Sequence, residues 1–237
     1  MAAVPSSPVY NRLHQPSIHR SVIDNSNPLS PSILQVDTLH FGYPQCPLFT
    51  GLSLHAPGGV SLVHGGDGAG KTTLLRLLAG ELAAQAGELR IRNIRLNDQP
   101  SAYRQQVFWV DPRSTAFDQT SPTDYFASLH VAYPQFDDLA VGALAEGLSL
   151  TEHLHKPVYM LSTGSKRKVW LAAAFASGAA LALLDDPFAA LDKPSIAYVK
   201  QLLLGAAGQT NRAYVVTGYD PAVLDGMPLV ATLDLGG

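Results

Sequence analysis

Residues 60–73 read VSLVHGGDGAGKTT, a short apolar run that passes directly into a glycine-rich segment ending in Lys-Thr-Thr. The segment matches the pattern G-x-x-x-x-G-K-[ST]. Leucines at helical spacing follow at Leu74, Leu75, Leu78 and Leu82. Glycines let a backbone wrap closely around a polyphosphate, and successive N–H groups with a helix N-terminus supply positive potential. The stretch therefore predicts a buried strand, a phosphate-binding loop and a helix.

Two side chains of this loop have expected roles in nucleotide binding. Lys71 is expected to bind the β- and γ-phosphates, and Thr72 to offer its hydroxyl to Mg²⁺. The predicted nucleotide-binding residues of the loop are Gly65, Gly66, Asp67, Gly68, Ala69, Gly70, Lys71, Thr72 and Thr73. The pattern alone does not choose among kinases, GTPases and ATPases. The Asn-Lys-x-Asp element with which GTPases usually read the base does not occur in the sequence.

A second apolar run, LALLDDP at residues 181–187, ends in two carboxylates. This is the form of a Walker B element, in which a strand delivers an aspartate to the phosphate loop. Asp185 is then placed to hold Mg²⁺ through water. The loop and this strand together predict a site for a nucleotide with a divalent cation.

Between these two elements, residues 161–168 read LSTGSKRK and precede a helical pattern over residues 169–177. Here the chain resembles the nucleotide-binding domain of ABC ATPases, whose signature reads LSGGQ or a near variant. Leu161, Ser162 and Gly164 match it, and the resemblance covers about residues 33–235. It implies an α/β P-loop NTPase fold of ABC type, with a mainly parallel core sheet, an antiparallel β subdomain and a helical insertion.

The resemblance also implies ATP as the nucleotide and a head-to-tail dimer. Tyr43 sits where the family places an aromatic that stacks on adenine, with Phe41 as the alternative. Ser162 and Gly164 would contact the nucleotide bound to a second ATP-binding subunit, in a homodimer or a heterodimer. Asp192 resembles the carboxylate of the D-loop, which communicates across that dimer.

Three departures from the family pattern fall on positions connected with hydrolysis. Asp186 stands in place of the general base Glu, one methylene shorter, and is the expected catalytic residue with Lys71. Gly218 stands where the switch His is expected, and Asp111-Pro112 where the Q-loop Gln is expected. The expected Mg²⁺ ligands are Thr72, Asp185 and Asp111. Because a lost or displaced catalytic group costs on the order of 10²-fold in rate, we expect nucleotide binding with slow hydrolysis.

The rest of the chain organises around these motifs. Residues 1–32 are rich in Ser and Pro and are expected to form a flexible leader, with a transit peptide as an alternative. Residues 33–237 form the expected ATP-binding domain, with a helical subdomain at about 112–170. SPTD at residues 121–124 predicts a helix start. Residues 60–63 and 181–184 predict buried parallel strands, and the alternation over 89–96 predicts one half-solvated antiparallel strand.

Composition excludes several classes of function. The formal net charge is −3, which argues against a nucleic-acid binder. No apolar stretch reaches the about 20 residues that span a bilayer, and no apolar core of a secretory signal occurs near residue 1. The single cysteine, Cys46, and the scattered histidines indicate no disulfide and no metal cluster. Only 15% of the residues are charged, which favours a surface partly covered by partners.

These observations lead to one expected function with two alternatives. We expect the ATP-binding subunit of an ABC transporter, cytoplasmic and peripheral on the inner face of the cell membrane. It would couple ATP binding and hydrolysis to transport through a separate membrane-spanning subunit. The alternatives are a soluble, non-transport ABC protein that acts as a nucleotide-dependent switch, and a regulatory subunit that only binds nucleotide.

Overall fold

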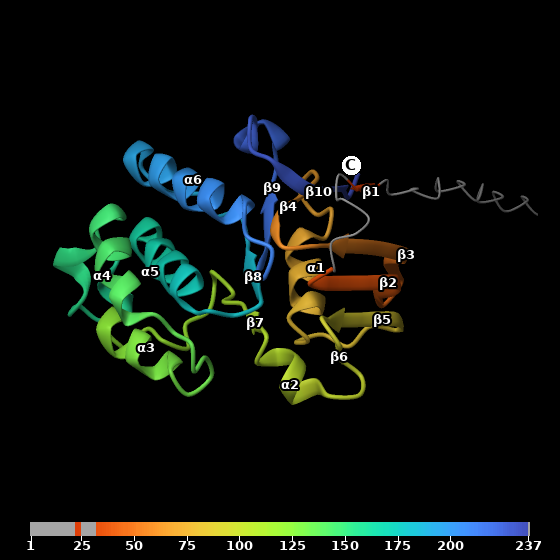
Figure 1. Cartoon of the computed structure of the whole chain (residues 1–237), viewed down its shortest axis with the longest axis horizontal. Helices are drawn as coiled ribbons and strands as arrows, with labels where there is room; N and C mark the ends of the chain where they lie inside the picture. Colours follow the sequence, from red (N-terminus) through yellow and green to blue (C-terminus); the bar gives the residue numbers. More distant parts are fainter. Residues whose placement is uncertain (1–21, 25–31, 237) are drawn as a thin grey trace, which may run out of the picture.

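A computed structural model of the chain describes residues 22–24 and 32–236. Within these residues the centre is a six-stranded sheet in the order β1-β10-β4-β9-β8-β7 (Figure 1). Every neighbouring pair is parallel except β1 with β10. The strands are β1 Val22–Asp24, β4 Gly59–His64, β7 Val107–Phe108, β8 Leu181–Leu184, β9 Ala213–Gly218 and β10 Leu229–Asp234. The mainly parallel core sheet expected from the sequence is confirmed.

An antiparallel sheet of four described strands, in the order β3-β2-β5-β6, lies on one side of the central sheet, with α1 between them (Figure 1). Its strands are β2 Leu34–Tyr43, β3 Cys46–Ala56, β5 Ala86–Ile91 and β6 Ile94–Arg95. The opposite side of the central sheet carries helices. The helices of the described chain are α1 Lys71–Leu78, α2 Pro100–Arg104, α3 Pro122–Leu129, α4 Asp138–Gly147, α5 Thr163–Ala176 and α6 Lys193–Ala207, with short 3₁₀ turns at Thr151–His153, Val158–Met160 and Pro221–Leu224.

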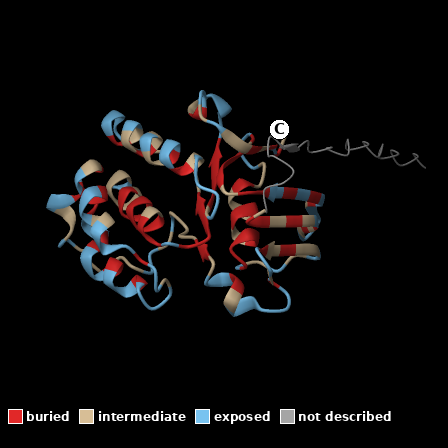
Figure 2. Ribbon diagram, viewed as in Figure 1, coloured by how far each residue is buried: buried red, intermediate tan, exposed pale blue. Residues whose placement is uncertain are grey.

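The central strands are buried on both faces, as continuous apolar runs require (Figure 2). Successive side chains of a strand point to opposite faces, and β8 shows the consequence. Leu181 and Leu183 pack into the core shared with α1 and the antiparallel sheet, whereas Ala182 and Leu184 pack into the core shared with the helices. The strand thus anchors two cores while its end carries Asp185 to the phosphate loop.

The helical insertion of the expected fold class is present: α3 and α4 lie in it, and α5 continues past residue 170 to Ala176. Ser121 caps α3 by accepting a hydrogen bond from the Asp124 N–H, so the helix starts where the SPTD stretch predicted. Tyr125 and Phe126 are buried, and Phe136 packs in the same cluster. These aromatics are core residues. No helix of the described chain has both the length and the apolar character needed to cross a membrane.

Three local expectations are corrected. Residues 89–96 form the hairpin β5–β6 rather than one strand, because Arg92 takes a left-handed backbone with φ of 53° and the chain reverses there. α1 ends at Leu78, so Leu82 lies beyond the helix to which its spacing assigned it. Val22–Asp24, placed in the flexible leader, form β1, which pairs with β10 and is the edge strand of the central sheet. Residues 1–21 and 25–31 of that leader lie outside the described residues.

The C-terminal end of α1 is held by α2. The buried Tyr103 hydroxyl donates to the Leu78 carbonyl at 2.9 Å. The Arg104 guanidinium donates twice to the Gly80 carbonyl, from Nε at 3.0 Å and Nη2 at 2.9 Å. Carbonyls at a helix end lack partners within the helix, so these side chains supply them. The helix that begins with the phosphate-loop lysine is therefore fixed at its far end as well.

This anchor makes a prediction about stability. Tyr103→Phe removes the hydroxyl and leaves the Leu78 carbonyl buried without that donor, so we expect a loss of about 1–2 kcal/mol in the free energy of unfolding, measured with urea. Tyr198→Phe is the matched control, because the Tyr198 hydroxyl donates to the Ala143 carbonyl at 3.1 Å in an exposed setting. Equal losses in the two variants would contradict the anchoring role.

Candidate functional site

The phosphate loop joins the end of β4 to the first turn of α1. Gly68 and Gly70 have φ of 73° and 95°, a backbone conformation that glycine adopts without strain. A Cβ on Gly66 or Gly68 would meet nothing within 4 Å, so the space beside these two glycines is open. The N–H groups at the start of α1 have no earlier turn of that helix to bond. The loop is therefore shaped as a cradle with free donors for an anion.

The Lys71 side chain is folded back over this loop. Its Nζ donates to the Gly65 carbonyl at 2.6 Å and to the Gly66 carbonyl at 2.7 Å, and the residue is 8% exposed. The same Nζ lies 4.0 Å from the centre of the Tyr219 ring. No carboxylate forms a salt bridge with Lys71 in the described part of the chain, so its positive charge is available to a phosphate.

Asp185 joins three elements at the carboxyl end of β8. Its Oδ2 accepts from Thr72 Oγ1 at 2.7 Å, and its Oδ1 accepts from Thr217 Oγ1 at 2.7 Å. Thr217 Oγ1 in turn accepts from the Asp186 N–H at 3.0 Å. The hydroxyl and the carboxylate expected to serve Mg²⁺ therefore lie in contact, although 113 positions separate them in the sequence.

Asp186 follows directly in a left-handed backbone conformation, with φ of 44°. The pKa of its carboxyl is raised above the usual range, mainly by burial and further by the negative charge of Asp185. The positive charges of Arg167 and Lys71 partly offset this rise. Arg167 Nη1 donates to the Asp186 carbonyl. The second carboxylate of the Walker B element is therefore partly buried between an arginine and a lysine.

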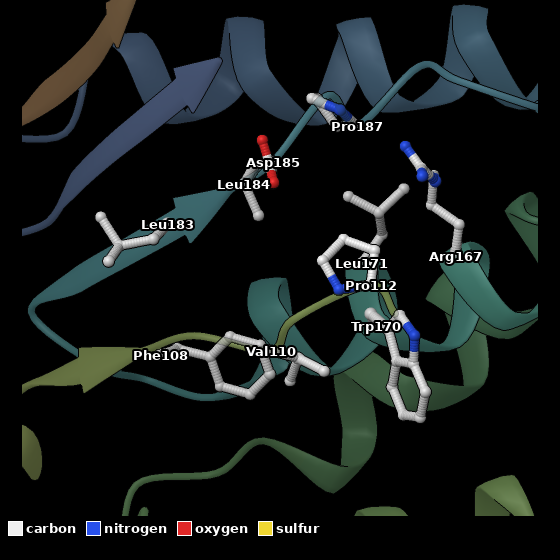
Figure 3. A pocket seen from close by; sticks show the side chains of 10 residues that line it. All are labelled: Phe108, Val110, Pro112, Arg167, Trp170, Leu171, Leu183, Leu184, Asp185 and Pro187. Atoms are coloured by element: carbon white, nitrogen blue, oxygen red, sulfur yellow. The ribbon is translucent and has the colours of Figure 1, made fainter. Parts of the chain in front are cut away.

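A mainly apolar pocket lies beside this end of β8 (Figure 3). It opens between β8, the segment after β7 and α5, and Figure 3 shows Val110 and Pro112 on one side, with Trp170 and Arg167 on the other. Asp185 projects at its margin. The pocket therefore marks the junction where the central sheet, the Q-loop segment and the helical insertion meet.

These residues fit a nucleotide with Mg²⁺. The loop offers an open cradle, Lys71 offers an ammonium group without an ion-pair partner in the described chain, and Thr72 with Asp185 offers the oxygen ligands that Mg²⁺ prefers. Tyr43 lies at the rim of the same site, 47% exposed, with its hydroxyl 3.3 Å from Thr73 Oγ1. Phe41 packs edge-on against Tyr43 and is buried, which leaves Tyr43 as the exposed aromatic of the two.

Three of the expected site residues lie apart from this cluster. Asp111 Oδ1 accepts from the Arg113 N–H at 2.9 Å, and no contact within the described residues joins it to Thr72 or Asp185. Ser162 caps α5, accepting from the Ser165 N–H at 3.1 Å. Gly164 lies in the first turn of α5, where a Cβ would come within 2.4 Å of the Ala190 carbonyl oxygen. Glycine there permits the close approach of the segment before α6.

Sequence reasoning missed three contacts of the site. Thr217, Tyr219 and Arg167 reach it from β9, the turn after β9, and α5. The basic run at residues 166–168 lies in the first turns of α5, where Lys166 bonds Asp118 at 2.9 Å and Lys168 bonds Asp192 at 2.6 Å. The Lys168 hydrogen bond lowers the pKa of Asp192, which also caps α6.

Solved structures share this fold. A structure described as the ATP binding subunit of an ABC transporter superposes with a TM-score of 0.75 at 20% identity, covering 83% of this chain and 83% of that one. The structure of cbiO1 from Clostridium perfringens, part of the ABC transporter complex cbiONQ, gives a TM-score of 0.62 at 21% identity, covering 82% and 81%. These likenesses establish the architecture.

Some relatives found by sequence share more identical residues with this chain than these solved structures do. The protein named cytochrome c biogenesis ATP-binding export protein CcmA from Pseudomonas savastanoi pv. phaseolicola (strain 1448A / Race 6) is 33% identical over 177 residues, covering 74% of this chain and 83% of the relative. Its namesake from Legionella pneumophila (strain Lens) is 36% identical over 168 residues, covering 69% and 82%. Residues 50–189, more than half of the chain, match the family described as ABC transporter. The chain therefore belongs to the ABC transporter family, as one of its ATP-binding subunits.

Proposed function

We propose that this chain drives transport by binding and slowly hydrolysing ATP, together with a separate membrane-spanning subunit. The observation that carries the proposal is the cluster in which Lys71 covers an open phosphate loop and Thr72 bonds the Asp185 carboxylate at 2.7 Å. The relatives named above are called ATP-binding export proteins, which supports export as the direction of transport. Such a subunit would lie peripherally on the cytoplasmic face of the membrane.

Each residue of the cluster has a chemical task in this proposal. The loop glycines and the first N–H groups of α1 bind phosphate oxygens, Lys71 binds the β- and γ-phosphates, and Tyr43 stacks on the adenine. Thr72 and Asp185 hold Mg²⁺, which supplies charge neutralisation when it is bound. Asp186, as a carboxylate, accepts a proton from the attacking water. Within the described chain Asp111 contacts neither Thr72 nor Asp185, and its Oδ1 accepts from the Arg113 N–H, so its other carboxylate oxygen would be the one to join the metal site.

A second ATP-binding subunit is part of the proposal. Ser162 is exposed at the start of α5 and has no described contact with the phosphate loop of its own chain. Gly164 lies beside it against the Ala190 carbonyl. An exposed serine at the start of a helix suits the nucleotide of a neighbouring subunit.

Slow hydrolysis follows from the groups around the terminal phosphate. Asp186 has a carboxylate one methylene shorter than a glutamate, and Gly218 supplies no side chain at the end of β9. Asp111 accepts hydrogen bonds as a carboxylate but cannot donate one as an amide does. Binding contacts through the loop backbone, Lys71 and Thr72 do not depend on these three residues. Affinity for ATP is therefore retained while the rate is reduced.

Removal of the lysine ammonium tests the binding site. Lys71→Ala is expected to weaken ATP binding by about 100-fold, because charge-assisted hydrogen bonds to phosphate are lost. Isothermal titration with ATP and Mg²⁺ measures the change. Lys156→Ala is the control, because Lys156 is an exposed lysine of the helical insertion. If Lys71→Ala binds ATP as tightly as the control, the loop is not the nucleotide site.

Restoration of the missing groups tests the slow rate. Asp186→Glu combined with Gly218→His is expected to raise ATP turnover by 10-fold or more, on the order of what one catalytic group contributes. The backbone accepts the second change, because a Cβ on Gly218 would meet the Val223 side chain at an ordinary 3.7 Å. Phosphate release measures turnover, and ATP affinity serves as the control for folding. Unchanged turnover in the folded double variant would contradict the explanation that these two residues slow hydrolysis.

The coupling to transport has its own test. The tagged chain, purified from detergent-extracted membranes of its own cells, is expected to bring down a polytopic membrane protein, and the recovered complex is expected to hydrolyse ATP. The same purification with Lys71→Ala should recover the partner without turnover. Recovery of the chain only from the soluble fraction, without such a partner, would favour the nucleotide-dependent switch instead.

A further inference from the structure

Tyr219 is the first residue after β9, and its side chain lies on the phosphate loop. Its hydroxyl donates a hydrogen bond to Asp67 Oδ1, and its ring centre lies 4.0 Å from Lys71 Nζ. The remainder of the residue is open, at 53% exposed. Tyr219 thus touches the two charged side chains of the loop, one of each sign, from a position 152 residues away from Asp67 in the sequence.

The ring covers the side of Lys71 that the loop leaves free. An ammonium group has three donors, and two of those on Lys71 are used on the Gly65 and Gly66 carbonyls at 2.6 and 2.7 Å. The third N–H is on the side of the Tyr219 ring. A charge-assisted hydrogen bond to a phosphate is directional and at least as strong as a cation–π contact. A phosphate oxygen therefore competes with the ring for the third donor.

The phenol is suited to donate rather than to accept. An ionised carboxylate such as Asp67 accepts hydrogen bonds only, so Tyr219 carries the proton of their contact. That hydrogen bond raises the pKa of the Tyr219 phenol above its ordinary value, and the phenol is an O–H donor at neutral pH. A terminal phosphate oxygen is also an anionic acceptor, and a phosphate group carries more negative charge than one carboxylate. A short rotation therefore exchanges one anionic acceptor for a more highly charged one.

We infer that Tyr219 makes this site prefer a nucleoside triphosphate over a diphosphate, by transferring its phenol from Asp67 to the terminal phosphate. The inference rests on the proposed function, since it assumes that the loop binds ATP. A diphosphate occupies the loop amides and Lys71 and leaves the phenol on Asp67. A triphosphate adds a phosphate within reach of the ring edge. The exposed position of Tyr219 gives the side chain room for this movement.

Tyr219→Phe tests the transfer, because phenylalanine keeps the ring and removes only the hydroxyl. In this variant the Asp67 bond is lost both without nucleotide and with ADP, so ADP affinity is expected to stay within about twofold of that of the unmodified chain. The variant without nucleotide has lost the Asp67 bond and its ATP complex has lost the phosphate bond, so the dissociation constant for ATP is expected to rise by the difference between the two bonds, about fivefold. The readout is the ratio of ATP to ADP affinity, by isothermal titration of the full chain with Mg²⁺.

The control is Tyr198→Phe, which removes a phenol on α6 remote from the loop and is expected to leave the ratio unchanged. The inference is overturned if the ratio in Tyr219→Phe is unchanged, if both nucleotides weaken equally, or if ATP binds more tightly. Failure of the proposed function is seen separately. If the unmodified chain binds no ATP, the loop is not a nucleotide site; if it binds ATP and only the ratio fails to move, the proposed function stands without this inference.

Discussion

The Asp185 carboxylate accepts one hydrogen bond from Thr72 and one from Thr217, each at 2.7 Å, and the arrangement of the site depends on these contacts. Thr72 belongs to the helix after the phosphate loop, Thr217 to β9 and Asp185 to the end of β8. The carboxyl ends of parallel strands meet at one edge of a sheet, and ligands bind outside that edge. The strand order β4-β9-β8 therefore brings loop, hydroxyl and carboxylate together.

Two hydrophobic cores hold that edge in place. One lies between the central sheet, α1 and the antiparallel sheet, and the other between the central sheet and the helices of the insertion and α6. α1 is fixed at its first residue by the Lys71 bonds to the loop and at its last turn by Tyr103. A change at the nucleotide therefore acts on a helix that is held at both ends and packed against the central sheet. The segments free to respond are the exposed side chains around the loop, Tyr219 among them.

Local sequence was sufficient to predict the elements whose defining residues are neighbours in the sequence. The strand, loop and helix over residues 60–78 and the strand before Asp185 follow from apolar runs and glycines. Periodicity predicted one strand over residues 89–96, where the chain reverses at Arg92. The alternation of apolar and polar residues continues on both sides of this short turn, so the pattern does not reveal it. Periodicity also gives no information on contacts between residues that are far apart in the sequence. The contact of Tyr219 with Asp67, and that of Arg167 with Asp186, depend on the packing of β9 and α5.

The central claim is that the chain binds ATP well and hydrolyses it slowly. The most direct measurement takes one preparation of the unmodified chain and records both its equilibrium binding of ATP with Mg²⁺ and its steady-state release of phosphate. The account predicts saturable binding with turnover below about 1 s⁻¹, at the low end of the usual range for enzymes. Turnover near the typical 10 s⁻¹, or the absence of saturable binding, would contradict it.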